Sequence, residues 1–189
     1  MEQQPDTVYY WGGVAYVLAA DDKRQAYKEH CGRMRQQFED PKSDYISETI
    51  VRTCLLLPDS TDPNTLPVKQ FTRAIDNETV SDERMPLAWS TRALLAYRRG
   101  EPKLAVQYVA ESEKHEADKA VHCANLSILA MAQCELELSE QSRQTLQEAK
   151  TELVHLQAAP ATNHLLSVLA LEIMTREAEA AVEGTKATK

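Results

Sequence analysis

The residues best suited to chemistry gather between positions 111 and 123, in the stretch ESEKHEADKAVHC. This stretch holds two histidines, His115 and His122, among several carboxylates, and it ends on Cys123. Imidazole and carboxylate groups gathered in this way can perform acid–base catalysis or bind a metal ion. No orienting partner can be named for any of them, and charge-rich tips are common where two helices meet. We therefore interpret the stretch as a solvated turn followed by the start of a helix.

The four cysteines, at positions 31, 54, 123 and 134, form no C-x-x-C pair. Each lies among apolar residues at helical spacing, which predicts reduced thiols that pack as small hydrophobic groups. His30, Cys31, His122 and Cys123 lack the spacing of metal ligands, so we predict neither a metal nor a cofactor. The sequence also lacks a glycine-rich phosphate loop, a Walker sequence and the H-R-D and D-F-G sequences of kinases. We predict that the chain is not an enzyme.

Bulk composition narrows the possible partners. The 189 residues are enough for one domain with a continuous core, and 43% of them are hydrophobic. A formal net charge of −8 without any run of Lys and Arg argues against nucleic acid or an anionic membrane as a partner. The apolar stretch 8–20 follows two acids and no base, so we interpret it as a buried helix rather than an export signal or a membrane span. We therefore expect a cytoplasmic protein.

The elements that would position any site are all predicted to be helices. Apolar residues recur every three or four positions, and Pro, Gly, Ser and Asp lie where helices would begin or end. The expected helices cover residues 7–20, 23–39, about 44–57, 67–75, 86–99, 102–114, 118–138, about 140–156 and 162–183. Ser139 is expected to cap the eighth of them. We expect a single all-α domain over 1–183 and a disordered tail over 184–189.

One helical hairpin recurs along the chain. In LAYRRGEPKLAVQY, Gly100 can close one helix and Pro102 can open the next, which makes the two helices antiparallel. Gly100 follows Trp89 by eleven residues and precedes Ala105 by five, and the same frame falls on two other sets, Leu126–Glu137–Ser142 and Tyr10–Asp21–Ala26. Glutamate adopts a left-handed turn at a cost of about 1 kcal/mol, so we expect the turn near 137–139 to be shifted or remodelled. Residues 43–80 do not fit the frame.

The recurring frame resembles the tetratricopeptide repeat, with small residues such as Ala93, Ala105 and Ala130 where paired helices approach closely. Five phrases are similar, in the same order, to the helical module attached to bacterial eukaryotic-like Ser/Thr protein kinases and to some WD40 proteins: VLAADDKRQAYKEHC, VRTCLLLPDS, LLAYRRGEPKLAVQY, ILAMAQCELELSEQSRQTLQEAK and LEIMTREAEA. The resemblance implies antiparallel helix hairpins stacked as a short, right-handed, tetratricopeptide-like α-solenoid. It also implies an accessory part that works with a linked or separate kinase or WD40 domain.

The expected function is a non-catalytic scaffold that binds a protein or peptide partner on the concave face of the stacked hairpins. The repeat frame places seven residues on that face: Trp11, Leu18, Leu94, Tyr97, Arg98, Ser127 and Met131. Tyr97 and Arg98 are the expected anchors, whereas Trp89 is expected in the core. Leu94 and Ala15 stand where the family's carboxylate clamp needs asparagine, so binding of chaperone tails is not expected. A structural dimerisation module and a helical sensor of small molecules are the alternatives.

Overall fold

The computed structural model describes residues 5–159 and 165–184, in which every regular element is a helix. The α-helices are α1 (Pro5–Ala20), α2 (Arg24–Gln37), α3 (Asp44–Cys54), α4 (Lys69–Asp76), α5 (Met85–Arg98), α6 (Pro102–Glu113), α7 (Lys119–Glu135), α8 (Ser139–Ala158) and α9 (Leu165–Gly184), and a 3-10 turn, η1, covers Pro63–Thr65. The prediction of an all-α fold is confirmed for these residues. Gly184, expected in the tail, is the last residue of α9, while 185–189 and the expected helix start at 162–164 lie outside the described residues.

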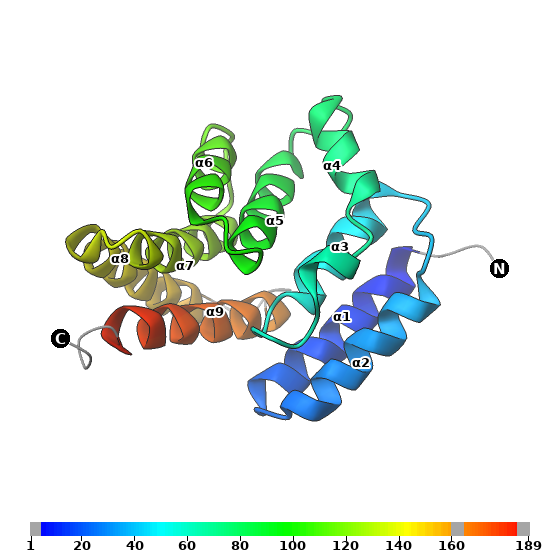
Figure 1. Cartoon of the computed structure of the whole chain (residues 1–189), viewed down its shortest axis with the longest axis horizontal. Helices are drawn as coiled ribbons and strands as arrows, with labels where there is room; N and C mark the ends of the chain where they lie inside the picture. The colour runs from blue at the N-terminus through cyan, green and yellow to red at the C-terminus, as the bar shows by residue number, and fades with distance from the viewer. Residues whose placement is uncertain (1–4, 160–164, 185–189) are drawn as a thin grey trace.

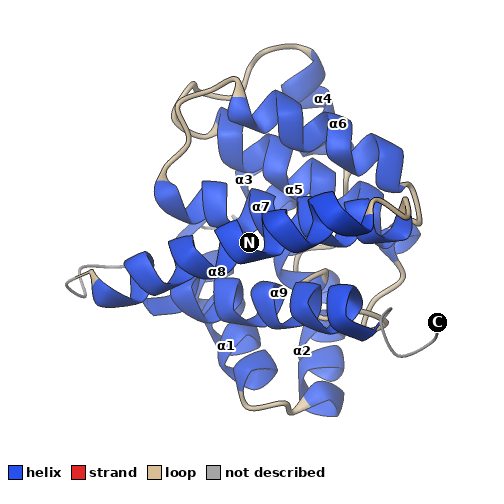
Figure 2. Ribbon diagram, turned by 90° about the vertical axis from the view of Figure 1, so that its left-hand side faces the viewer, coloured by secondary structure: helices blue, strands red, loops and turns tan. Residues whose placement is uncertain are grey.

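The helices follow an arc along the chain, as Figure 1 shows. The pair α1–α2 lies at one end, α3 and α4 come next, and the pairs α5–α6 and α7–α8 complete the arc. Helix α9 returns across the opening of this arc and contacts α7, α8 and α1. Figure 2 shows α8 and α9 lying side by side. A connected cluster of buried apolar side chains extends from α1 to α9, so the last helix belongs to the same core as the first.

Three helix pairs, α1–α2, α5–α6 and α7–α8, are joined by the same type of turn. Its middle residue, which we call the turn residue, has a positive φ: 54° at Asp22, 73° at Gly100 and 60° at Glu137. In each turn, the N–H of the following residue donates to the carbonyl five positions earlier, from Lys23 to Leu18 at 3.0 Å, from Glu101 to Ala96 at 3.0 Å and from Leu138 to Gln133 at 2.9 Å. This pattern is the Schellman motif, which satisfies carbonyls at the end of the first helix.

Three predictions about these turns are wrong. The turn stays at Glu137, which adopts the left-handed conformation itself. The packing of α7 on α8 offsets the modest cost of that conformation. In the first pair Asp22, rather than Asp21, is the turn residue, so the frame moves by one position. Ser139 does not cap α8: it is the first helical residue, and Leu138 stands at the N-cap without a side-chain hydrogen bond. The turn uses Glu137 and Leu138, which leaves Ser139 one position too late to cap.

The corrected frame gives the three pairs a common packing pattern. Seven residues before the turn residue, every pair has a fully buried alanine: Ala15, Ala93 and Ala130. Five residues after it, the buried residues are Tyr27, Ala105 and Ser142, and Tyr27 replaces the half-buried Ala26 of the predicted frame. Side chains as small as alanine let paired helix backbones approach closely in α5–α6 and α7–α8, whereas Tyr27 is large and α1 and α2 approach each other less closely. The predicted burial of Ala93, Ala105 and Ala130 is confirmed.

Trp89, expected in the core, packs against the core at its edge rather than inside it. Trp89 is half-buried, and its ring packs on Tyr108 of α6 at 5.5 Å between centroids, with the guanidinium of Arg92 above both rings. Trp11 holds the same position in the first pair and stacks on His30 at 5.0 Å. Each indole covers the seam between the two helices of its own pair. An indole at such a seam contacts both helices but keeps one edge in solvent.

Candidate functional site

The seven residues predicted to form a partner-binding groove are dispersed through the structure. Ser127 and Met131 are fully buried, and Leu94 is nearly so. Trp11 and Leu18 are half-buried on α1. A partner cannot reach Ser127 or Met131 in this conformation, because other parts of the chain cover them completely. Burial therefore favours a packing role for these two residues, and partner binding by the set of seven stays a prediction.

Tyr97 and Arg98, the expected anchors, lie in a depression of about 540 Å³ beside the loop that follows α3. The Arg98 guanidinium forms a two-point ion pair with Glu177 of α9, with 2.7 Å between Nη2 and Oε2. It also donates to the carbonyls of Leu55 at 2.9 Å and Leu56 at 3.2 Å. Burial acts to lower the pKa of Arg98, but the Glu177 carboxylate outweighs burial and raises that pKa. These contacts hold Arg98 within the fold.

One side of α1, which we call the α1 face, exposes large apolar side chains. It consists of Tyr9, Tyr10, Gly13, Val14, Val17 and Leu18, which line a surface groove of about 390 Å³. Tyr10 is 70% exposed, and Tyr9, Val14 and Val17 are each about half exposed. The other side of α1 is buried through Val8, Gly12, Ala15, Tyr16 and Ala19. The interpretation of 8–20 as a buried helix is thus only partly right, because this apolar helix has one face in the core and one in solvent.

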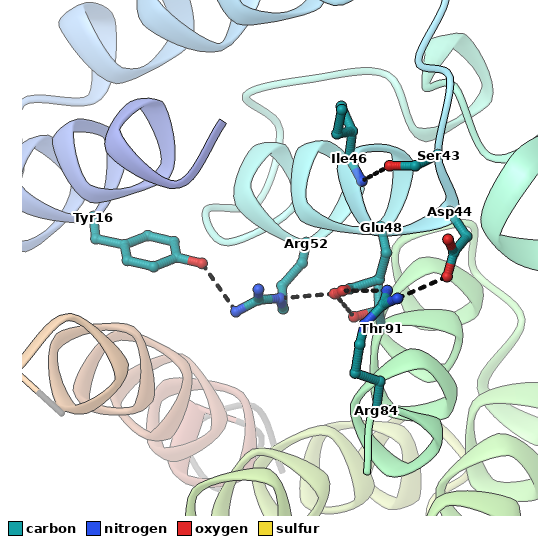
Figure 3. Close-up of polar contacts among 8 residues, drawn as sticks. All are labelled: Tyr16, Ser43, Asp44, Ile46, Glu48, Arg52, Arg84 and Thr91. Carbon is teal, nitrogen blue, oxygen red and sulfur yellow. Dashed lines mark hydrogen bonds and ion pairs between the residues drawn. The ribbon is translucent and has the colours of Figure 1, made fainter. Parts of the chain in front are cut away.

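A polar network with Glu48 and Thr91 at its buried centre lies where α3 meets α5 (Figure 3). The Glu48 side chain is only 1% exposed, and its Oε1 accepts hydrogen bonds from Arg52 Nε at 2.9 Å and Thr91 Oγ1 at 2.8 Å. Arg84 lies 4.0 Å from the other oxygen of Glu48 and forms a closer ion pair, 2.8 Å, with Asp44. Two guanidinium groups and two carboxylates balance one another, so the network carries no net charge.

Arg52 connects this network to a cavity of about 130 Å³ among α1, α3, α5, α7 and α9. Its Nη1 donates to Tyr16 Oη at 3.2 Å, and this hydrogen bond joins α3 to α1 (Figure 3). Burial acts to lower the pKa of Arg52, but Tyr16 and Glu48 together raise it, so the guanidinium stays charged. Leu94 is the one member of the predicted groove that lines this cavity.

Sequence reasoning missed both Glu48 and Arg52. The sequence offered one indication of this pair. The two residues are four positions apart, a spacing that lets their side chains pair on one helix face. The same spacing is common on solvated helix faces, so it does not by itself indicate a buried pair.

The stretch 111–123 forms the connection between α6 and α7, as predicted, but its side chains pair more closely than expected. Nδ1 of His122 lies 3.0 Å from the Glu113 carboxylate, to which Asn125 Nδ2 also donates at 2.6 Å. Asp118 accepts a backbone N–H from the first turn of α7 and caps that helix. Among the described residues, no three side chains of His, Cys, Asp and Glu gather as metal ligands would.

All four cysteines are in the thiol form, and Cys31, Cys54 and Cys123 are buried, whereas Cys134 is half-buried. A hydrogen bond from Cys54 lowers the pKa of Cys31, and the same contact raises the pKa of Cys54. Burial raises the pKa of Cys123 to about 11. Cys54 and Cys123 are therefore poor nucleophiles at neutral pH.

Comparisons with known proteins find no relative. No protein-family model matches the chain, and no curated protein or solved structure is significantly similar to it. Within residues 5–159 and 165–184, no helix has both the length and the apolar character needed to cross a membrane. A functional proposal therefore rests on the chain's own residues.

Proposed function

We propose that the chain is a non-catalytic protein-interaction module, built from tetratricopeptide-like helix pairs that stack as a short right-handed solenoid. The shared turn at Asp22, Gly100 and Glu137 and the alanines buried at one position of each pair support a structural repeat. In line with the sequence resemblance, the partner is a Ser/Thr kinase or WD40 polypeptide, either linked to this chain or separate from it.

The α1 face is the observation that supports this proposal most directly. Val14 and Val17 lie beside two exposed tyrosines, Tyr9 and Tyr10, whose rings meet edge to face at 6.2 Å between centroids. Contiguous apolar surface of this kind marks interaction sites on proteins, and aromatic residues are enriched among those that contribute most to binding. Burial of these side chains against an apolar surface of a partner would stabilise a complex by the hydrophobic effect.

The inner side of the arc is a poorer binding surface than the sequence predicted, because α9 packs on it. Ser127 Oγ on α7 lies 3.2 Å from Thr175 Oγ1 on α9, and both residues are buried. The Arg98–Glu177 ion pair holds α9 to α5 as well. A partner on this side would have to displace α9, whereas the residues that the structure describes leave the α1 face open. We therefore assign partner binding to the α1 face.

The experiment compares proteins that copurify with a tagged wild-type chain and with the double variant Val14→Lys/Val17→Lys from cells that express the natural gene. Gln144→Lys, on the exposed side of α8, is the matched control. We expect a kinase or WD40 polypeptide to be enriched by the wild type and the control and lost from the double variant. Melting temperatures of all three should agree, because the changed side chains face solvent. Identical sets of captured proteins would contradict the proposal.

The alternative function is dimerisation through the same surface, and Gly13 within the α1 face is the observation that favours it. A glycine there would let the α1 helices of two copies approach closely. Light scattering over a range of concentrations separates the two functions. A dimer that Val14→Lys/Val17→Lys dissociates would support the alternative, and a monomer throughout would support binding to a different protein.

A further inference from the structure

The cavity beside Arg52 has the size and walls of a small-molecule site. Its volume is about 130 Å³, and Leu94, Ile128, Leu171 and Met174 are among its apolar lining residues. A cavity of about 150 Å³ in another protein holds benzene, so a space of about 130 Å³ is large enough for a ligand of similar size. We propose that the cavity binds a small uncharged molecule, a ring or short chain of about six to ten non-hydrogen atoms, that carries one carbonyl or similar hydrogen-bond acceptor.

The ligand needs a hydrogen-bond acceptor because Arg52 has donors to offer it. A guanidinium has five N–H groups, and among the described residues only two of those of Arg52 have partners: the Nε–H pairs with Glu48, and one Nη1–H pairs with Tyr16. Arg52 lines the cavity and its side chain is 32% exposed, so the donors that Glu48 and Tyr16 do not use are open to a ligand there. A charged donor in such a place gains from an acceptor that a purely apolar ligand cannot offer.

The balance of charge selects an uncharged ligand over an anion. Glu48 already neutralises Arg52, and Asp44 neutralises Arg84. Asp118 adds a further carboxylate to the cavity lining. A ligand carboxylate would lose its hydration and then face Glu48 and Asp118 without a free cation to offset the cost. A carbonyl avoids that cost and still accepts a hydrogen bond from Arg52.

Methionine-methyl NMR of the full chain tests the proposal with three probes of similar shape: acetophenone, toluene and benzoate. Met174 lines the cavity and reports binding there, while Met34, buried in α2 and outside the lining, is the internal control. We expect acetophenone to shift the Met174 signal alone. Toluene, which has no acceptor, should bind about tenfold more weakly. Benzoate should also bind more weakly than acetophenone.

Two variants locate the ligand and test the role of charge. Ala124→Leu adds volume to the cavity lining and should weaken acetophenone binding about tenfold or more, whereas Ala110→Leu, on the exposed side of α6, should leave it unchanged. Glu48→Gln keeps the side-chain shape but leaves Arg52 uncompensated, so it should make benzoate the preferred ligand. If Glu48→Gln does not fold, the comparison of Ala124→Leu with Ala110→Leu still tests whether acetophenone binds in the cavity.

Four results would overturn the proposal. They are no shift at Met174 with any probe, equal affinity for acetophenone and toluene, a preference of the wild type for benzoate, and acetophenone binding that Ala124→Leu leaves unchanged. None of them bears on the α1 face, which lies outside the cavity. The two proposals therefore stand or fall separately.

Discussion

Arg98 on α5 and Glu177 on α9, 79 residues apart in the chain, form a two-point ion pair. Their side chains are only 7% and 18% exposed. Because the same guanidinium also binds the carbonyls of Leu55 and Leu56, one side chain joins α5, the end of α3 and the last helix. The residue that the sequence indicated as a binding anchor therefore serves to fasten α9 in place.

Replacing Arg98 should destabilise the fold strongly. Arg98→Ala leaves the Glu177 carboxylate and two carbonyls without their donor, and we expect a loss of about 3–5 kcal/mol in the free energy of unfolding. Urea denaturation measures this loss. Lys114→Ala, which removes an exposed ion pair with Glu111, is the control and should change stability by no more than about 0.5 kcal/mol. Equal effects of the two substitutions would show that the Arg98 pair does not hold the fold together.

Glu137→Gly should stabilise the chain. Glu137 has a φ of 60°, and glycine adopts this conformation without the steric cost of a Cβ atom. We expect a gain of about 1 kcal/mol, which raises the melting temperature by about 2–4 °C.

Gly100→Ala is the matched control for that substitution. A Cβ at Gly100 would meet no atom within 4 Å, so conformational strain alone should lower the melting temperature there. Thermal melts that show no rise for Glu137→Gly would mean that its side chain makes compensating contacts.

Stability should fall in alkaline solution as Cys123 titrates. Its pKa is about 11 in the fold, because burial disfavours the thiolate, and about 8.5 in the unfolded chain. This contribution is complete below pH about 8.5 and is lost as pH rises toward 11, at up to about 1.4 kcal/mol per pH unit.

In Cys123→Ala the free energy of unfolding should fall less steeply with pH between pH 9 and 10.5. The slope, measured by urea titrations, should be smaller by the equivalent of about one proton. The slope is the diagnostic quantity, because the cavity left by the substitution lowers stability by a similar amount at every pH. Slopes that agree for the two proteins would rule out the raised pKa of Cys123.

Helix positions and the buried alanines could be predicted from the sequence, because both depend on local periodicity. The frame of the first pair was wrong by one residue since Asp21 and Asp22 are chemically identical candidates for the turn. The positive φ of Asp22 and the hydrogen bond from Lys23 to the Leu18 carbonyl distinguish them, and both are properties of the folded turn.

Contacts between distant segments could not be predicted in this way. Glu48 is buried because α5 packs on α3, and Thr91, 43 residues later, donates to its carboxylate. The inner side of the arc is covered because α9 packs against α7, which no repeat frame in the sequence indicates. The stretch 8–20 reads as buried since it is apolar throughout, yet burial of one face depends on which helices pack on α1 and which side they leave open.

Photo-crosslinking from Val17 tests the central claim, partner binding at the α1 face, most directly. A photoreactive amino acid is placed at Val17 in one chain and at Gln144 in another, both expressed in the cells that carry the natural gene, and crosslinked products are identified by mass spectrometry. Both positions are exposed, so neither label should disturb the fold. We predict a crosslinked kinase or WD40 polypeptide from Val17 and none from Gln144. The same products from both positions, or none from Val17, would contradict the account.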